Sequence, residues 1–231
     1  MRLSRPELIV FDLDGTLVDS APDIAHAVDI MLDKLGLPPA GEVRVRGWIG
    51  NGVAMLVKRA LAGERHPEGE PPRLDEALAL FMDAYAAHLC DRGRLYEGVA
   101  EGLARIKAEG YRTACVTNKH SRFTEPLLEQ LGIAHYLDFV GSGDQFGKHK
   151  PDPEPLLKAA EHFGVEPKRC LMVGDSANDA EAARRAGFML ALVPYGYHGG
   201  TDLAALRPDV VIDSVAGLPG LFGVRDCGYC G

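Results

Sequence analysis

The sequence predicts an α/β fold with a helical insertion, and two patterns carry this prediction. Before residue 20 and after residue 90, short β-rich runs alternate with helical patterns of about ten residues. Residues 20–92 contain helical patterns and no convincing strand. Strands joined through helices run parallel, because each crossover returns the chain to the same end of the sheet. We therefore expect a parallel sheet with helices on both faces, together with a separate helical unit.

The sheet is expected to form from segments that follow one another along the chain. The β-rich runs are residues 8–11, 113–116, 171–173 and 189–193, with a weaker fifth at 210–212. The helical patterns between them are residues 100–109, 122–131, 154–163 and 177–186. This alternation predicts a Rossmann-like core formed by residues 1–19 and 93–231.

The helical insertion is expected to cover the end of the first strand. Its helical patterns span residues 21–35, 53–61 and 74–89, and the glycine, proline and charge of residues 63–72 are typical of a loop. The insertion begins directly after the acidic loop that follows the first strand. Residues 20–92 are therefore predicted to form an α-helical cap domain over that loop.

Charge and hydropathy narrow the classes of partner. The 231-residue chain has a formal net charge of −8, whereas nucleic-acid-binding proteins present a basic surface to the phosphates. No apolar run approaches the roughly 20 residues that a membrane span needs, and the charged first residues do not resemble a secretory signal. We expect a cytoplasmic protein that binds a small anionic molecule through local basic groups, as a monomer or a homodimer.

The five cysteines form an odd set and do not suggest a disulfide scaffold. Cys227 and Cys230 have the spacing of half a zinc site or of a redox pair, but a second pair at comparable spacing is missing. Both fall in the last residues of the chain, where an untethered tail is the alternative interpretation. The sequence leaves their role open.

Small polar and acidic residues follow three of the predicted strands, at the point where each strand ends. They are Asp12, Asp14 and Gly15 after residues 8–11, Thr117 and Asn118 after residues 113–116, and Asp175, Ser176, Asn178 and Asp179 after residues 171–173. In an open parallel sheet, ligands gather beyond the carboxyl ends of the strands. We therefore expect these groups to meet at one edge of the sheet.

The paired acids after the first strand indicate a cation and a phosphate. Unpaired buried carboxylates cost several kcal/mol or shift their pKa until they are neutral. Mg²⁺ prefers a few oxygen ligands, and Asp12, Asp175 and a main-chain carbonyl near Asp14 would hold it together with a phosphate. Asp12 is then placed as a nucleophile and Asp14 as the proton donor to the leaving group. Hydrogen bonds to the phosphate oxygens are expected from Thr117, Asn118 and the backbone N–H of Gly15.

A lysine is expected to supply the positive charge that two neighbouring carboxylates need. Lys148 and Lys150 are both within reach, and Lys150 is favoured because Pro151 stiffens the loop and can fix where the preceding residue points. Each of these residues also has a purely structural interpretation. Acids after a strand can cap the following helix, and a lone lysine is usually a solvated charge.

Taken in order, these motifs resemble those of the haloacid dehalogenase superfamily, with a helical cap inserted after the first motif. The matching segments are residues 12–16, Thr117 with Asn118, Lys150 with Pro151, and residues 174–179, so the resemblance spans nearly the whole chain. It implies a Mg²⁺-dependent enzyme in which Asp12 is the nucleophile and Asp14 the acid/base. It further implies metal ligation by Asp12, Asp14 and Asp175, stabilisation of phosphate and nucleophile by Thr117 and Lys150, and support of the metal ligands by Asp179, Ser176 and Asn178.

The cap contains an unusual segment, residues 44–53, that is expected to select the substrate. Gly50 and Gly52 leave backbone amides open to a small anion, Asn51 adds a donor, and Arg46 can counter a carboxylate. The alternative is an N-terminal turn for the helix that starts near residue 53, with Trp48 in the core.

The cap segment also refines the resemblance. Residues 48–52 and 193–197 resemble the bacterial branch of the superfamily that hydrolyses 2-phosphoglycolate to glycolate and phosphate. The alternatives are the same mechanism on a sugar phosphate or another small phosphate monoester, a phosphomutase, and a non-enzymatic phosphate-binding protein. A dehalogenase is disfavoured, because by the same resemblance those enzymes lack the acid at the position of Asp14.

Overall fold

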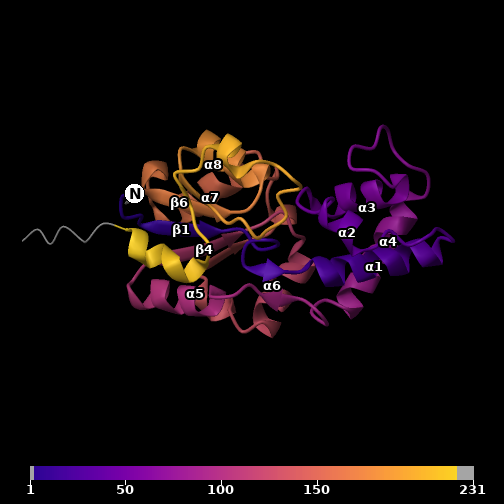
Figure 1. The fold of residues 1–231 in the computed structure, drawn as a ribbon, viewed down its shortest axis with the longest axis horizontal. Coiled ribbons are helices and arrows are strands. Elements are labelled where there is room, and N and C mark those ends of the chain that lie inside the picture. The colour runs from indigo at the N-terminus through magenta and orange to yellow at the C-terminus, as the bar shows by residue number, and fades with distance from the viewer. Residues whose placement is uncertain (1–2, 223–231) are drawn as a thin grey trace, which may run out of the picture.

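A six-stranded parallel sheet forms the centre of the larger part of the molecule (Figure 1). The computed structural model describes residues 3–222, and the strand order is β5-β4-β1-β6-β7-β8. The strands are β1 (Leu8–Phe11), β4 (Arg112–Val116), β5 (Phe139–Gly141), β6 (Cys170–Gly174), β7 (Met189–Leu192) and β8 (Val210–Val211). The predicted α/β class with a parallel sheet is confirmed.

Helices cover both faces of this sheet. They are α5 (Val99–Ala108), α6 (Ser121–Gln130), α7 (Glu154–Phe163) and α8 (Ala177–Ala186). Figure 1 shows α7 and α8 on one side of β1, β4 and β6, and α5 and α6 on the other. Short 3-10 helical turns occupy Ala134–Tyr136, Gly143–Gln145, Pro167–Arg169, Leu203–Leu206 and Val215–Leu221.

The central strand shows why the sheet needs two helical layers. Every residue of β1 is completely buried. Leu8 and Val10 pack into the cluster that contains α7 and α8, whereas Ile9 and Phe11 pack into the cluster on the opposite face. Because successive strand side chains point to opposite faces, a run of four apolar residues is stable only between two apolar layers.

The helices of the insertion lie to one side of the sheet (Figure 1). They are α1 (Ala21–Lys34), α2 (Glu42–Arg46), α3 (Gly52–Ala62) and α4 (Leu74–Ala87). Their buried face includes Met31, Val57, Phe81 and Tyr85. Each predicted helix of this segment is present within a few residues of its expected bounds, and the 20–92 domain division stays a prediction.

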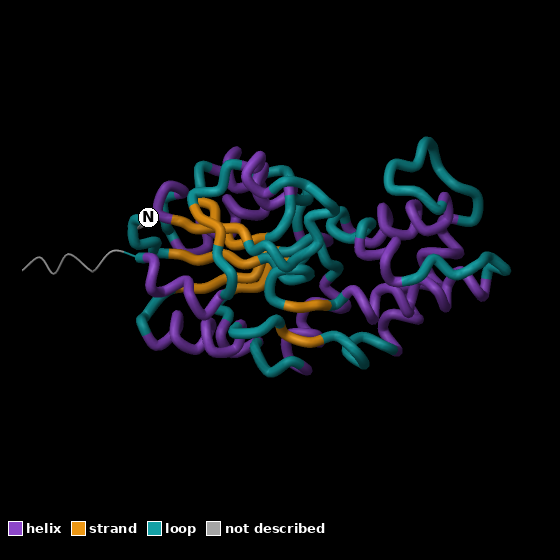
Figure 2. The backbone as a smooth tube through the Cα atoms, in the orientation of Figure 1, coloured by secondary structure: helices purple, strands orange, loops and turns teal. Residues whose placement is uncertain are grey.

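A small antiparallel pair of strands, which the sequence analysis missed, joins the two parts. Strand β2 (Val18–Asp19) pairs with β3 (Arg94–Leu95), one just before and one just after the insertion (Figure 2). Two residues are too few to show an alternating pattern. The short elements β5 and α2 were missed because they too are shorter than the window in which a strand or helix periodicity can be recognised. Cys227 and Cys230 lie outside the described residues. Within residues 3–222, no helix is long and apolar enough to cross a membrane.

Candidate active site

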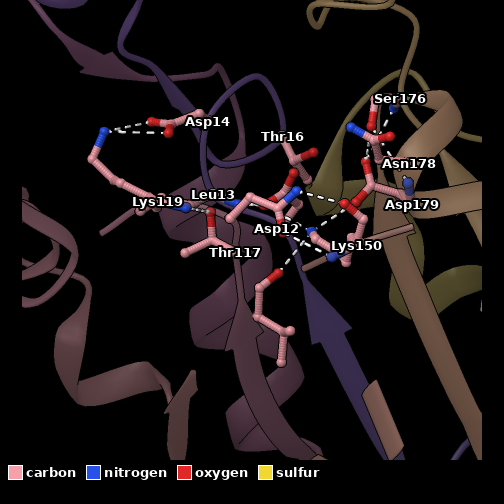
Figure 3. A network of polar contacts seen from close by, with 12 residues as sticks. Asp12, Leu13, Asp14, Thr16, Thr117, Lys119, Lys150, Ser176, Asn178 and Asp179 are labelled. Atoms are coloured by element: carbon pink, nitrogen blue, oxygen red, sulfur yellow. Dashed lines mark hydrogen bonds and ion pairs between the residues drawn. The ribbon is translucent and has the colours of Figure 1, made fainter. Parts of the chain in front are cut away.

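Three neighbouring strands deliver polar residues to one edge of the sheet. Asp12 follows β1, Thr117 follows β4 and Asp175 follows β6, and β4 and β6 flank β1. The backbone N–H of Asp12 donates to the carbonyl of Val173 at 2.9 Å, so the hydrogen bonds of the sheet extend to Asp12. Figure 3 shows Asp12 among Thr117, Lys150 and the loop after β6.

Asp12, Asp175 and Asp179 form an acidic cluster that fits a divalent cation. One carboxylate oxygen of each lies within 4.8 Å of the others. Asp179 is already committed, because Oδ1 accepts from Lys150 Nζ at 2.7 Å and Oδ2 accepts from the hydroxyl of Ser176 at 2.6 Å. Within residues 3–222, Oδ2 of Asp12 accepts no hydrogen bond. Asp175 accepts one hydrogen bond at each oxygen but, in the described part of the chain, pairs with no lysine or arginine, so Asp12 and Asp175 are the pair with capacity for a metal.

The electrostatics of this pair also fit a cation. Burial raises the pKa of Asp12 to about 6, against the opposing effect of the Lys150 ammonium and with a further contribution from Asp179. Burial, followed by repulsion from Asp179 and Asp12, raises the pKa of Asp175 well above its usual range. A cation between the two carboxylates would stabilise their ionised forms.

The loop after β1 and the segment after β7 hold Asp175 in place. The hydroxyl of Thr16 donates to Asp175 Oδ1 at 2.8 Å, and the backbone N–H of Tyr197 donates to Oδ2 at 2.5 Å. Gly15 has φ +88°, and a Cβ there would stand 2.4 Å from Asp175 Oδ2, so the turn requires glycine. The backbone N–H of Gly15 donates to the carbonyl of Val18 at 2.9 Å and does not reach the cavity, contrary to the expectation that it contacts phosphate.

Lys150, and not Lys148, enters the site. Lys150 is buried, and its ammonium lies 3.0 Å from Asp12 Oδ1 and 2.7 Å from Asp179 Oδ1, and it donates to the carbonyl of Val116 at 2.8 Å. Attraction to the two aspartates outweighs burial and raises the pKa of Lys150. Lys148 is exposed and pairs with Asp152 at 3.4 Å. The residue before Pro151 is therefore the one that faces Asp12.

Asp14 forms a second, separate ion pair in the site. Both of its carboxylate oxygens accept from Lys119 Nζ, at 3.0 and 3.2 Å, and Oδ1 also accepts from the hydroxyl of Ser20 at 2.6 Å. Lys119 is buried and donates to the hydroxyl of Tyr85, on cap helix α4, at 2.6 Å. Burial disfavours its charged form, but attraction to Asp14 and Tyr85 outweighs this and raises the pKa of Lys119, which is cationic at neutral pH.

The sequence analysis missed Lys119, Ser20 and Tyr85. Lys119 directly follows Thr117 and Asn118, so its place in the same strand-end loop was the signal available. Nothing in the local sequence marks Ser20 or Tyr85, because their contact with the site depends on how the helical segment docks.

Thr117 lines the cavity beside Asp12, and its hydroxyl oxygen accepts from the backbone N–H of Lys119 at 3.2 Å. Asn118 is used differently from the expectation that it donates to phosphate. Its amide oxygen accepts from the backbone N–H of Lys150 at 2.9 Å, and its amide nitrogen donates to the carbonyls of Lys150 and Gly50, at 2.8 and 2.9 Å. Asn118 therefore positions Lys150 and joins it to the cap.

A cavity opens between the strand ends and the helical segment. Its lining residues are Asp12, Asp14, Ile24, Ile49, Gly50, Gly52, Val53, Leu56, Phe81, Tyr85, Thr117, Asn118, Lys119 and Phe123. The sheet side of this cavity is acidic and polar, whereas the helical side is almost wholly apolar. The predicted cap residues Gly50 and Gly52 are thus at the cavity.

The other two predicted cap residues are not brought to the cavity. Arg46 pairs with Asp19 at 2.9 Å and with Glu42 at 2.8 Å. The amide oxygen of Asn51 accepts from buried Arg59 at 3.0 Å. Arg46 thus joins α2 to strand β2, whereas Asn51 contacts Arg59 of α3 within the helical segment.

Ser176 and Asn178, expected behind the metal ligands, have distinct positions. Ser176 caps α8: its hydroxyl accepts from the backbone N–H of Asp179 at 3.4 Å, within a reciprocal capping box. Asn178 donates from its amide nitrogen to the carbonyl of Gly50 at 3.0 Å. Asn178 thus contacts the cap and not the acidic cluster.

Comparisons with known proteins agree with this arrangement. The family model of the haloacid dehalogenase-like hydrolases matches residues 6–187. A phosphoglycolate phosphatase from Nitrosococcus oceani is 49% identical over 92% of this chain and 95% of its own length, and one from Escherichia coli is 43% identical over 90% and 88%.

Solved structures extend the comparison to three dimensions. A crystal structure described as a predicted phosphoglycolate phosphatase from Haemophilus somnus has a TM-score of 0.87 and 37% identity, covering 94% of this chain and 98% of that one. CbbY from Rhodobacter sphaeroides in complex with phosphate has a TM-score of 0.77 and 26% identity, covering 94% and 99%. From the family match, the close relatives and the shared fold, this chain belongs to the haloacid dehalogenase-like hydrolase family.

Proposed function

We propose that this protein is a Mg²⁺-dependent phosphatase that converts 2-phosphoglycolate to glycolate and inorganic phosphate through an aspartyl-phosphate intermediate. The observation that carries the mechanism is that Asp12 and Asp14 line one cavity and each faces its own buried lysine. The names of the relatives that are 43% and 49% identical support the substrate.

Each residue of the site has a defined task in this reaction. A carboxylate oxygen of Asp12 attacks phosphorus and the bond from phosphorus to the ester oxygen breaks. Asp14, which takes up a proton from solvent before this step, gives that proton to the departing glycolate oxygen. Water then attacks the aspartyl phosphate, Asp14 takes a proton from that water, and the Asp12 carboxylate is restored as phosphate leaves. Lys150 stabilises the ionised nucleophile, and Thr117 is placed to donate to a phosphate oxygen.

Asp12 and Asp175, together with the main chain at Asp14, are the proposed Mg²⁺ ligands. The bound cation would neutralise the phosphoryl oxygens and so stabilise the charge that develops in the transition state. Asp179 holds Lys150 and caps α8, and so stands behind the ligands. Residues 20–92 are proposed to act as a cap that closes over the bound ester, excludes bulk water from it and sets the specificity.

The central experiment measures phosphate release from 2-phosphoglycolate with Mg²⁺ and with a chelator. We expect turnover that chelation abolishes and that added Mg²⁺ restores. Asp12→Asn should lower kcat by at least about 10³-fold, because the amide is not a nucleophile. Metal-independent turnover, or full activity of this variant, would contradict the mechanism.

The variant Asp14→Asn distinguishes the role of Asp14 from that of Asp12. With p-nitrophenyl phosphate, whose leaving group needs no proton, this variant should still form a phosphoenzyme that accumulates, because water is no longer activated. Asp12→Asn should form none. Equal amounts of phosphoenzyme in the two variants would contradict the proposed roles of Asp12 as nucleophile and Asp14 as acid/base.

A second candidate keeps this chemistry and changes the substrate. One structural relative, a mutant of CbbY from Rhodobacter sphaeroides that is 25% identical, was solved in complex with xylulose-(1,5)bisphosphate. Comparing kcat/KM for 2-phosphoglycolate with a panel of sugar phosphates decides between them. The apolar cap wall of the cavity offers few partners for sugar hydroxyls and favours the smaller substrate.

A further inference from the structure

The charge balance of the cavity singles out one residue that the proposed reaction does not use. Two of the residues that line the cavity, Asp12 and Asp14, are acidic, and Lys119 is the only basic one among the described residues that line it. The opposite wall includes Ile49, Val53 and Leu56, which offer no side-chain partner for an anion. Among the described residues that line the cavity, Lys119 therefore offers the one cationic side chain to an anionic group of the substrate other than its phosphate.

Lys119 is held in place from both sides of the cavity. Its side chain is 3% exposed, its ammonium contacts both oxygens of Asp14 at 3.0 and 3.2 Å, and it donates to the hydroxyl of Tyr85 at 2.6 Å. The ammonium also lies 4.6 Å from the centre of the Tyr85 ring. Burying a lysine this deeply costs stability unless its charge has a use or a partner.

We propose that Lys119 is the specificity-determining residue of this enzyme and binds the carboxylate of a small phosphorylated carboxylic acid. This inference rests on the proposed function and names the residue that reads the end of the substrate opposite the phosphate. Arg46, the cation expected from the sequence, is paired with Asp19 outside the cavity and leaves this role vacant.

The position of Lys119 next to Asp14 fits the size of such a substrate. In 2-phosphoglycolate a single methylene group separates the ester oxygen from the carboxylate carbon. The residue that protonates the ester oxygen and the cation that binds the carboxylate must therefore be direct neighbours. Asp14 and Lys119 are in contact, and they come from loops that follow two adjacent strands, β1 and β4.

Binding of the carboxylate also changes the state of Asp14. A substrate carboxylate that accepts from the Lys119 ammonium competes with Asp14 for the same donors. Asp14, released from the ammonium, is then free to turn toward the ester oxygen. A substrate without a carboxylate leaves the Lys119 ammonium paired with Asp14. Asp14 then cannot turn toward the ester oxygen, and such a substrate is disfavoured.

The test compares two substrates that differ only at the end opposite the phosphate: 2-phosphoglycolate and 2-hydroxyethyl phosphate. The measured quantity is the ratio of their kcat/KM values. Lys119→Met should lower this ratio by about 10- to 150-fold, as expected for loss of a charge-assisted hydrogen bond. Lys119→Arg should keep part of the preference. Lys148→Met, which removes an exposed lysine paired with Asp152, should leave the ratio unchanged.

A binding measurement keeps the test independent of turnover. Glycolate carries the carboxylate and inorganic phosphate does not, so Lys119→Met should weaken inhibition by glycolate and leave inhibition by phosphate within about twofold. If Lys119→Met fails to fold, Tyr85→Phe takes its place, because it removes one hydrogen bond from the ammonium. It should lower the ratio of kcat/KM for 2-phosphoglycolate to that for 2-hydroxyethyl phosphate.

The outcomes separate this inference from the proposed function. An unmodified enzyme that does not prefer 2-phosphoglycolate over 2-hydroxyethyl phosphate overturns both. An unmodified enzyme with the preference, together with Lys119→Met that keeps it, overturns the role of Lys119 alone. An equal loss on both substrates assigns Lys119 to positioning Asp14 and likewise overturns the role proposed here.

Discussion

The ammonium of Lys150 lies 3.0 Å from Asp12 Oδ1 and 2.7 Å from Asp179 Oδ1, so a single buried cation joins the proposed nucleophile to the residue that caps α8. Asp12 follows β1 and Asp179 lies in the first turn of α8, far apart in the sequence. The lysine therefore fixes the distance between two segments that only the folded chain brings together. Removing it would leave two buried carboxylates without their partner.

We expect Lys150→Met to inactivate and destabilise the protein. Loss of one partner from a buried ion pair costs about 3–5 kcal/mol, and kcat should fall by at least about 10³-fold because the nucleophile loses its ionised form. Chemical denaturation and phosphate release measure the two effects. Lys148→Met is the matched control, because Lys148 is exposed and should change neither value by much. Equal effects of the two substitutions would contradict the assignment to Lys150.

Stability without metal should fall as the pH rises toward neutrality. The pKa of Asp12 is about 6 in the folded protein and near 3.8 in the unfolded chain, so the folded state binds more protons between these values. The contribution of Asp12 is fully present below pH 3.8 and is lost as the pH rises through about 6. The slope is at most about 1.4 kcal/mol per pH unit from this group, and denaturant unfolding in chelator measures it.

Asp12→Asn should flatten this pH dependence, since asparagine does not titrate. Asp175 shifts in the same direction, so a residual slope is expected in the variant. A metal-free protein whose free energy of unfolding rises through this pH range would contradict the electrostatic description of the site.

Mg²⁺ should raise the Tm of the protein, with an effect that depends on Asp175. A ligand that binds only the folded state stabilises it by mass action, and here it also neutralises two carboxylates with raised pKa values. In Asp175→Asn the amide oxygen can accept from the backbone N–H of Tyr197 and the amide nitrogen can donate to the hydroxyl oxygen of Thr16, so the variant should fold and yet lose the Tm shift. Below about pH 6, protons compete with the metal, and more Mg²⁺ should be needed for the same shift.

Asn118 and Asn178 provide a matched pair of substitutions at the cap contact. Both donate to the carbonyl of Gly50, at 2.9 and 3.0 Å, but Asn118 also holds the backbone of Lys150. We expect Asn178→Ala to raise KM a few-fold with little change in stability. Asn118→Ala leaves buried backbone groups unpaired and should cost about 2 kcal/mol or more, with a loss of kcat. Identical kcat and KM values for the two variants would show that the hydrogen bonds from Asn118 to the backbone of Lys150 do not contribute to activity.

The sequence by itself determined the sheet and the acidic residues that stand at its edge. Residues 8–11 form a buried strand because a continuous apolar run needs two covering layers, and the acids that follow it must then stand at the strand end. Helices 154–163 and 177–186 begin and end where the periodicity and the caps predict, since those signals are local.

Only the tertiary structure decided which side chains face the cavity. Arg46 and Asn51 were plausible anion-binding residues, but in the folded chain Arg46 pairs with Asp19 of β2 and Asn51 accepts from Arg59 of α3. Lys119 was overlooked, because only the folded chain places it between Asp14 and Tyr85. Local sequence sets where strands and helices begin, whereas the partners of a long charged side chain depend on segments far away in the chain, and no local pattern encodes them.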